Sequence, residues 1–418
     1  MRPHILVIHR SRGPIVAYLD HIDHTTNTVT YVCATQVLDR IPQHAATETV
    51  IFDDTEPVHD IVRTLITRHG IPERIVAISE TDLLTAAQLR SEFGIAGDTP
   101  AHALPFRDKL VMYERATAAG IAVPAFADAP NATAISTFAR RFGWPVLVKP
   151  RLGAASRDIV TLRHAAELAN LPDLQDEPFL VQRLCPDETG SVDGVWTGTE
   201  LGPWRGSRYL HSCLDFATGQ NSWGTIDIDD QALNVKMADF ACSVLTALSA
   251  GTPTVFHLEL FLGPVNAPRL QLLEIAGRIP GAEATHLWRE VHHYDLVGAA
   301  LDIQMGRSPT APPRGPGQLA GQLLVRPPLP PPCVVTATRL DVSPEYAPYH
   351  YAIPAVGQAI TETSGYVGIG ASFRFRADTS RAVADAIAHT ASGFRIDCAT
   401  TEFEKKAKYP QPPQLSVE

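Results

Sequence analysis

The chain has 418 residues, a formal net charge of −10 and 19% charged residues. This length allows roughly two or three domains, and the 45% hydrophobic content is typical of a folded protein rather than a disordered one. The excess of acidic residues argues against nucleic acid as a main partner, because phosphate binding needs clustered Lys and Arg.

The sequence indicates neither a membrane protein nor an oxidising compartment. No apolar run approaches the length of a membrane span, and the run ILVI at 5–8 is too short for a signal-peptide core. The six cysteines are scattered and form no CxxC pair, which argues against a disulfide framework or a zinc site. We therefore expect a cytoplasmic enzyme.

The N-terminal part of the chain alternates short apolar runs with helical patterns. Each predicted helix there ends at a glycine, the residue favoured at a C-terminal cap. This alternation predicts the α/β fold class, with a small open sheet. Strands are predicted within 4–10, 29–35, 49–54 and 74–79, and helices over 57–70 and 82–94.

Further helices and strands are expected along the rest of the chain. Residues 308–333 are rich in proline and indicate a boundary or an exposed connection. Helices are predicted over 108–120, 133–143, 163–170, 285–303 and 380–393, and strands within 121–126, 144–150, 178–184, 255–262 and 270–276. The expected domains are 1–105, 106–185, 186–310 and 311–400, followed by a loose tail at 401–418.

Two acidic residues interrupt the apolar strands at 255–262 and 270–276. If these strands form a hairpin centred between Asn266 and Ala267, Glu259 lies opposite Glu274. Like charges at opposite positions repel, so a cation is required, and oxygen ligands favour a hard ion such as Mg²⁺. The alternative is an acid pair that is neutralised by Lys or Arg, or that faces water.

Three further residues stand out near predicted strand ends. Arg278 follows the second acidic strand and suits bidentate binding of a carboxylate or phosphate, although it could also be a surface arginine. Lys149 precedes a Gly/Ala/Ser loop whose backbone N–H groups suit a triphosphate, although lysines at strand ends are common. Gln182 lies where backbone groups could contact a flat base, or in an ordinary strand. A P-loop is excluded, because GxxxxGK[ST] is missing from the sequence.

Taken in order, these segments resemble the ATP-grasp superfamily of carboxylate–amine ligases, from residue 1 to about residue 400. RDKLVMYERATAAG resembles the segment with the first ATP-binding lysine, and VLVKPRLGAAS the second lysine with its phosphate loop. LVQRLCPDE resembles the adenine hinge, and FHLEL and LLEIAGRIPG resemble the metal-binding strands. The resemblance implies these site residues: Lys109, Lys149, Gly153, Ser156, Gln182, Leu184 and Glu188 for ATP, Glu259 and Glu274 for metal, and Arg278 for catalysis.

The sequence departs from the superfamily pattern at two places. Ala276 stands where many members have an Asn as a further metal ligand, and Ala155 and Asp158 replace two glycines of the phosphate loop. An E-x-x-x-R pattern without that Asn resembles the branch of L-amino-acid ligases, which make dipeptides or related amides.

The resemblance implies an ATP-grasp fold with an N-terminal open α/β pre-grasp domain, a central subdomain with the phosphate loop, and C-terminal lobes. It implies ATP and Mg²⁺ (two ions, for which Mn²⁺ can substitute), small carboxylate and amine substrates, an acyl phosphate and a homodimer. The alternatives are a carboxylase acting through carboxyphosphate and a catalytically silent nucleotide-binding regulator. His257 shares a face with Glu259 and either touches the site or is structural, and His286, His292 and His293 are assigned no role.

Overall fold

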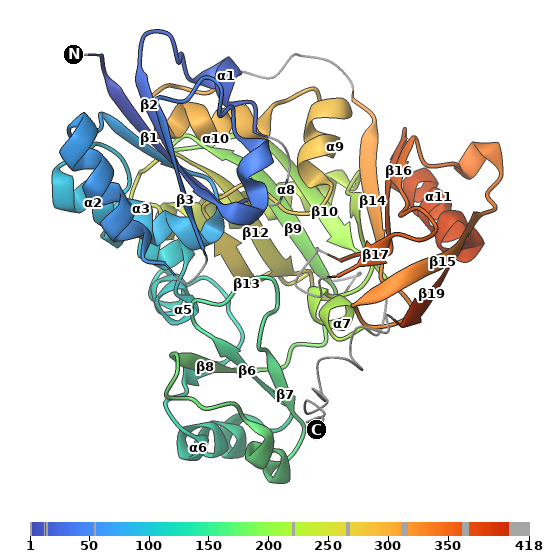
Figure 1. Ribbon diagram of the computed structural model, residues 1–418. Coiled ribbons are helices and arrows are strands. Elements are labelled where there is room, and N and C mark those ends of the chain that lie inside the picture. Colours follow the sequence, from blue (N-terminus) through green and yellow to red (C-terminus); the bar gives the residue numbers. More distant parts are fainter. Residues whose placement is uncertain are drawn as a thin grey trace, which may run out of the picture.

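The strands that the structure describes form four sheets, which helices cover (Figure 1). Within the described residues, no helix has both the length and the apolar composition needed to cross a bilayer. The tail predicted at 401–418 lies outside the described residues. The structure, a computed structural model, describes residues 2–11, 13, 16–53, 56–219, 222–264, 268–310, 317–361 and 368–400.

The N-terminal region forms a parallel sheet in the order β3-β2-β1-β4, which confirms the predicted open α/β sheet. β1 is buried along its whole length, as expected for a strand of a parallel sheet covered on both faces. The strands are β1 (His4–His9), β2 (Thr28–Ala34), β3 (Glu48–Phe52) and β4 (Arg74–Ala77), and the α-helices are α1 (Tyr18–His21), α2 (Val58–His69), α3 (Leu83–Phe93) and α4 (Pro100–Ala103). Short 3₁₀ helices cover Thr35–Arg40, Glu80–Asp82 and Leu104–Phe106.

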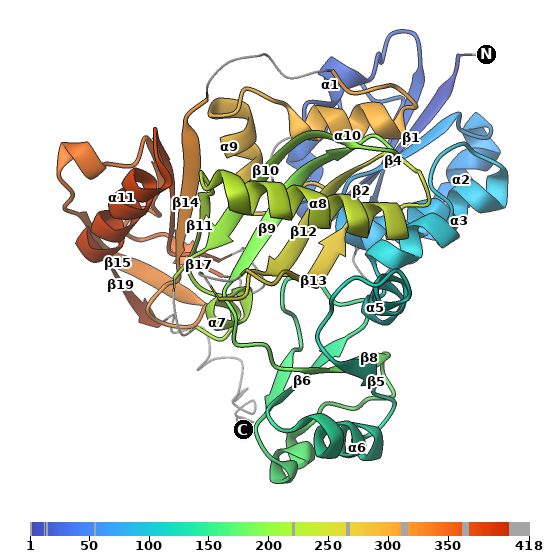
Figure 2. The same ribbon diagram turned by 180° about the vertical axis from the view of Figure 1, so that it is seen from behind.

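A smaller lobe projects from the main body (Figures 1 and 2). Its antiparallel sheet has the order β5-β8-β6-β7. Asp108 caps the helix that leads into it by accepting hydrogen bonds from the next turn's backbone N–H groups. The elements are α5 (Lys109–Ala118), β5 (Phe126–Asp128), α6 (Ala132–Phe142), β6 (Val146–Pro150), β7 (Val160–Leu162) and β8 (Phe179–Arg183). The helix predicted at 163–170 is a 3₁₀ helix, Ala165–Asn170.

An eight-stranded sheet forms the centre of the main body, in the order β13-β12-β9-β10-β11-β14-β18-β16. α8 (Gln231–Leu248) crosses one face of this sheet (Figure 2) and buries Met237 and Leu245 against it. Its strands are β9 (Thr189–Trp196), β10 (Leu201–Tyr209), β11 (Trp223–Asp227), β12 (Thr254–Phe261), β13 (Gln271–Ala276), β14 (Leu319–Val325), β16 (His350–Ala352) and β18 (Ala371–Ala377). The short helix α7 (Cys213–Ala217) connects β10 to β11.

Two sequence predictions on the main body are wrong in detail. The helix predicted over 285–303 is broken into α9 (Ala284–Glu290) and α10 (Leu296–Gln304), because His293 between them adopts a left-handed conformation with φ of 54°. The proline-rich stretch 308–333 is not only a connection, because β14 lies within it and pairs with β11 and β18.

The C-terminal residues add a three-stranded sheet in the order β17-β15-β19 and one long helix. These elements are β15 (Cys333–Leu340), a 3₁₀ helix (Pro344–Tyr346), β17 (Ala359–Ile360), α11 (Ser380–Gly393) and β19 (Phe394–Thr400). α11 confirms the helix predicted at 380–393. The eight-stranded sheet continues through the boundary expected between 310 and 311, and the division into domains stays a prediction.

The close approach of β9 and β10 allows a stability prediction. A Cβ atom added at Gly194 would lie 2.4 Å from the carbonyl oxygen of Pro203 and 2.8 Å from Cα of Trp204, both backbone atoms. We expect Gly194→Ala to lower the free energy of unfolding by about 1–3 kcal/mol, because strands must shift to relieve the overlap. Gly202→Ala on the same hairpin is the control, since its nearest neighbour would lie at 3.4 Å. Equal urea unfolding curves for the two variants would contradict this account.

Candidate active site

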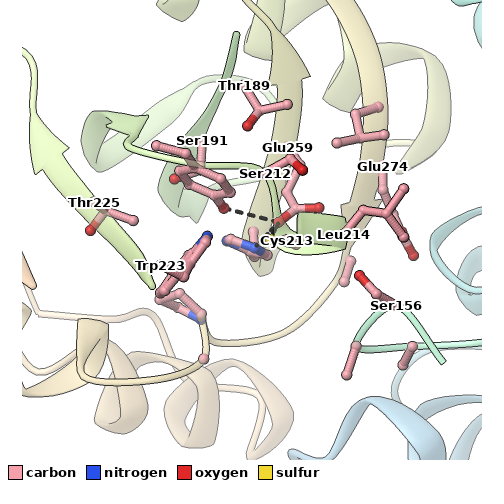
Figure 3. A pocket seen from close by; sticks show the side chains of 18 of the residues that line it. Ser156, Thr189, Ser191, Ser212, Cys213, Leu214, Trp223, Thr225, Glu259 and Glu274 are labelled. Atoms are coloured by element: carbon pink, nitrogen blue, oxygen red, sulfur yellow. Dashed lines mark hydrogen bonds and ion pairs between the residues drawn. The ribbon is translucent and has the colours of Figure 1, made fainter. Parts of the chain in front are cut away.

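One cavity lies where the smaller lobe meets the eight-stranded sheet, and most of the predicted site residues line it. Figure 3 shows Glu259 and Glu274 on neighbouring strands, with Ser156 of the β6–β7 loop near them. The predicted residues that line this cavity are Lys109, Lys149, Gly153, Ser156, Leu184, Glu259, Glu274 and Arg278. Gln182 and Glu188 are not among the lining residues.

The cross-strand pairing of Glu259 and Glu274 is confirmed. From Leu260 onward along β12, the pairing is shifted by one residue relative to the prediction, so that Leu260 pairs with Leu272. A bulge next to this pair restores the predicted register at Glu259 and Glu274. The carbonyl of Leu273, the residue in the bulge, accepts a hydrogen bond of 2.7 Å from the Tyr113 hydroxyl. Because the bulge keeps Glu259 opposite Glu274, both carboxylates lie on the face of the sheet that lines the cavity.

Each carboxylate is neutralised by its own cation. Lys109 Nζ lies 2.7 Å from Glu274 Oε1. His257 Nε2 lies 3.5 Å from Glu259 Oε1, and the Tyr209 hydroxyl donates to the same oxygen at 2.9 Å. Burial alone would raise the pKa of Glu259, but the hydrogen bond and charge of His257, together with Tyr209, lower it to about 2.

His257 takes part in the site and is also a hydrogen-bonded histidine. Its Nδ1 binds the buried carboxylate of Asp193, and its Nε2 faces Glu259. Burial would lower its pKa, but the charge of Asp193 and the hydrogen bonds to Asp193 and Glu259 raise it to about 9. His257 is therefore a cation near pH 7 and balances the acids around it.

The loop between β6 and β7 is tied to the segment 107–109 by three successive residues. Arg107 Nη2 donates to the Leu152 carbonyl at 2.7 Å, and Lys109 Nζ donates to the Gly153 carbonyl at 2.6 Å. Between them, Arg151 donates to both carboxylate oxygens of Asp108, at 3.0 and 2.6 Å. These contacts hold the loop over the cavity.

Three residues of this loop that are not glycine have a left-handed backbone. Ala155, Ser156 and Asp158 have φ of 54°, 57° and 56°. Ala155 and Asp158 are the positions where the superfamily pattern commonly has glycine. The backbone thus adopts a conformation that suits glycine, although the sequence has replaced it.

Glu80, which sequence reasoning did not identify, links the N-terminal region to the site. It is buried, accepts a hydrogen bond of 2.9 Å from Arg278 Nε, and forms an ion pair with Arg107. Burial would raise its pKa, but Arg278 and Arg107 lower it. A signal was present in the sequence, because Glu80 follows β4 closely and ligands of open α/β sheets bind beyond the carboxyl ends of strands.

Gln182, Glu188 and Lys149 have neighbours that bear on their predicted roles. The buried amide oxygen of Gln182 lies 2.9 Å from the Tyr113 hydroxyl oxygen, and this hydroxyl accepts a hydrogen bond from Lys149 Nζ at 3.3 Å. Glu188 is exposed and forms an ion pair with Arg208, whereas the next residue, Thr189, lines the cavity. The roles of Gln182 and Glu188 in nucleotide binding stay predictions.

The donor set fits a hard divalent cation bound together with phosphate. Two carboxylates from adjacent strands supply oxygen ligands, and Ala276 lines the cavity without adding one. Across the ranges that the structure describes, no group of three or more His, Cys, Asp and Glu could hold a metal by itself. Phosphate oxygens and water would complete the coordination, which is the usual arrangement for Mg²⁺ at ATP sites.

No protein-family model matches the chain. The L-arginine-specific L-amino acid ligase of Bacillus subtilis is 28% identical over 279 residues, which cover 64% of this chain and 66% of that protein. The chain thus spans slightly less than two thirds of this relative.

Solved structures share the fold over almost the whole chain. An L-amino acid ligase from Bacillus licheniformis has a TM-score of 0.72 and 13% identity, covering 94% of this chain and 98% of its own. N5-carboxyaminoimidazole ribonucleotide synthetase from Thermotoga maritima has a TM-score of 0.65 and 15% identity, with 94% and 99% covered. The biotin carboxylase domain of a Hydrogenobacter thermophilus 2-oxoglutarate carboxylase, solved with MgADP and bicarbonate, has a TM-score of 0.63 and 14% identity, with 95% and 91% covered.

These findings confirm the predicted ATP-grasp fold. They also confirm the resemblance of the chain to the ATP-grasp carboxylate–amine ligases.

The position of Glu80 between two arginines allows a prediction on stability. We expect Glu80→Gln to lower the free energy of unfolding by about 3 kcal/mol, because it removes the counter-charge beside the buried guanidinium of Arg107 and the partly buried guanidinium of Arg278. Glu92→Gln, which breaks an exposed pair with Arg63, is the matched control and should change it by less than about 1 kcal/mol. Chemical denaturation measures both free energies. A Glu80 variant as stable as the Glu92 variant would show that the ion pairs of Glu80 with Arg107 and Arg278 do not stabilise the fold.

Proposed function

We propose that the protein is an ATP-dependent ligase that activates a small carboxylate as an acyl phosphate and joins it to an amine, releasing ADP and phosphate. The observation that carries this proposal is the meeting of Glu259 and Glu274 with Lys109, Lys149 and Arg278 in one cavity. Two acids that can hold Mg²⁺, two lysines that can bind phosphates and an arginine supply the positioning and charge neutralisation on which phosphoryl transfer depends.

The nucleotide is held between the smaller lobe and the sheet. Lys109 and Lys149 bind its phosphates, with backbone N–H groups of the loop that contains Gly153 and Ser156. Gln182 and Leu184 border the adenine, and the ribose lies near Glu188 and Thr189. The carboxylates of Glu259 and Glu274 hold Mg²⁺, two ions in our proposal, with Mn²⁺ as a substitute, and the bound metal neutralises the charge of the phosphates.

The chemistry proceeds in two transfers. A carboxylate oxygen of the first substrate attacks the γ-phosphorus and ADP leaves. The amine nitrogen then attacks the carbonyl carbon, phosphate leaves, and the nitrogen gives up a proton. Arg278 stabilises the charge on the acyl phosphate and on the tetrahedral oxyanion, and Glu80 fixes its guanidinium through the 2.9 Å hydrogen bond.

We propose amino acids as the substrates and a dipeptide or related amide as the product. The support is the E-x-x-x-R pattern of Glu274 and Arg278, together with similarity to proteins named as L-amino acid ligases.

The function is tested by phosphate release from Mg·ATP across pairs of amino acids, with products identified by mass. Glu274→Ala and Arg278→Ala are expected to reduce turnover by about 10²–10³-fold, because each removes a charge that is needed in the transition state. Glu200→Ala, at the exposed β9–β10 turn, is the control and should retain full activity.

A condensed product that requires both substrates and is lost in both site variants establishes the ligase. Release that requires bicarbonate instead would identify a carboxylase. Binding of Mg·ATP without release for any pair would favour the regulatory alternative, and the absence of ATP binding would refute the proposal.

The environment of Lys149 predicts how nucleotide binding depends on pH. Burial lowers the pKa of this lysine to about 8, although Glu274 opposes the shift. Phosphate binding needs the charged form, so above pH 8 the free protein must take up a proton to bind ATP. We expect the ATP affinity to fall by up to about tenfold per pH unit between pH 8 and pH 10.

Isothermal titration in buffers of different ionisation enthalpy measures this proton uptake directly. Lys149→Arg is the control, because arginine stays charged over this range and should remove the pH dependence. Equal proton uptake by the two proteins would show that another group is responsible.

A further inference from the structure

We propose that Arg205 binds a carboxylate carried by the amine substrate, so that this substrate is an amino acid rather than a simple amine. The inference rests on the proposed ligase function and deepens it. It assigns a binding role to a residue on β10 that neither the sequence motifs nor the nucleotide site involves.

Arg205 lies on the same face of the sheet as the acidic pair and lines the same cavity. In the ladder, Arg205 faces Asp193, Asp193 faces His257, and His257 faces Ala276. Glu259 is two residues further along β12, so the spacing of strands and residues puts its Cα about 12 Å from that of Arg205. An arginine side chain and a small amino acid together can span this distance.

A series of hydrogen-bonded, buried polar side chains, His292 and then Asp227, orients the guanidinium of Arg205. Its Nε donates to Nδ1 of His292 at 3.3 Å. Nδ1 therefore accepts, and Nε2 carries the proton towards Asp227 Oδ2, 3.0 Å away. Asp227 also accepts hydrogen bonds from the backbone N–H of Ala320 at 2.7 Å and from the Ser207 hydroxyl at 3.2 Å.

These supporting side chains are buried and closely packed. The side chains of His292 and Asp227 are only 3% and 8% exposed. The ring of Trp288 packs edge-on against His292, with centroids 5.7 Å apart. These contacts restrict the orientation of the Arg205 guanidinium, as expected for a side chain that binds a ligand.

The end of the Arg205 side chain is available to a ligand. Nη1 donates to the Trp204 carbonyl at 3.0 Å. Among the described residues, no ion pair engages Arg205, and its cross-strand neighbour Asp193 is bound to His257 and Ser191 instead. The residue is exposed to the cavity, so the Nη2 edge can bind a carboxylate.

The position of Arg205 selects the amine as the substrate that it binds. The phosphates lie with Lys109, Lys149 and the loop, and Arg278 lies on the β13 side of the acids. Arg205 lies on the opposite side, two strands beyond β12. An amine that approaches the carbonyl carbon from there would place a carboxylate on its α-carbon next to Arg205.

Arg205→Met tests this inference by binding and by turnover. Isothermal titration compares L-amino acids with their α-amides, in which a neutral carboxamide replaces the carboxylate, on protein saturated with a non-hydrolysable Mg·ATP analogue. We expect the wild-type protein to prefer the amino acid and the variant to lose about 30–100-fold of its affinity for it, with little change for the amide. In turnover, KM for the accepting amino acid should rise by the same factor, with a smaller rise in Arg205→Lys.

Arg339→Met, which removes an exposed arginine at the end of β15, is the matched control and should behave as wild type. Equal thermal midpoints would show that Arg205→Met is folded. A preference for the acid that persists in Arg205→Met, or no preference in the wild type, overturns the assignment. An effect confined to the activated amino acid, shown by residue order in the product, also overturns it. A binding preference that depends on Arg205 in a protein that forms no product supports this site while refuting the ligase.

Discussion

The repulsion between Glu259 and Glu274 is the constraint around which the cavity is arranged. Their carboxylates face each other across β12 and β13, where like charges destabilise a sheet. Lys109 comes from the helix that leads into the smaller lobe, and His257 comes from the strand of Glu259 itself. The ion pair of Lys109 with Glu274 therefore joins the smaller lobe to the main body. A cation that binds the two acids must compete with Lys109 and His257.

A second electrostatic link extends from this centre into the N-terminal region. Glu80 binds Arg278, which lines the cavity, and Arg107, which holds the β6–β7 loop through the Leu152 carbonyl. One buried carboxylate thus fixes the arginine of the site and the loop above it. The N-terminal region, whose described strands do not line the cavity, is therefore connected to it through Glu80.

The acidic hairpin could be predicted from sequence because its charges interrupt apolar strands. The predicted pairing of Glu259 with Glu274 is correct because a bulge offsets the one-residue shift of the pairs that begin at Leu260. β9 was missed for the opposite reason. Its cavity-facing residues Thr189, Ser191 and Asp193 are polar, so no hydrophobic run marks the strand. Glu80 and Arg205 could not be placed from spacing alone, because their partners Arg278 and His292 are distant in sequence and meet them only in the folded chain.

The left-handed residues of the β6–β7 loop bear on how firmly the loop is held over the cavity. A side chain in this conformation costs about 1 kcal/mol, so Ala155, Ser156 and Asp158 together store on the order of 3 kcal/mol in the position that covers the cavity. The contacts of Arg107 and Lys109 hold the loop there against this strain. A loop held in place at such a cost is released readily once one of these contacts is lost, and in the reaction that we propose this favours escape of products over long retention of the nucleotide.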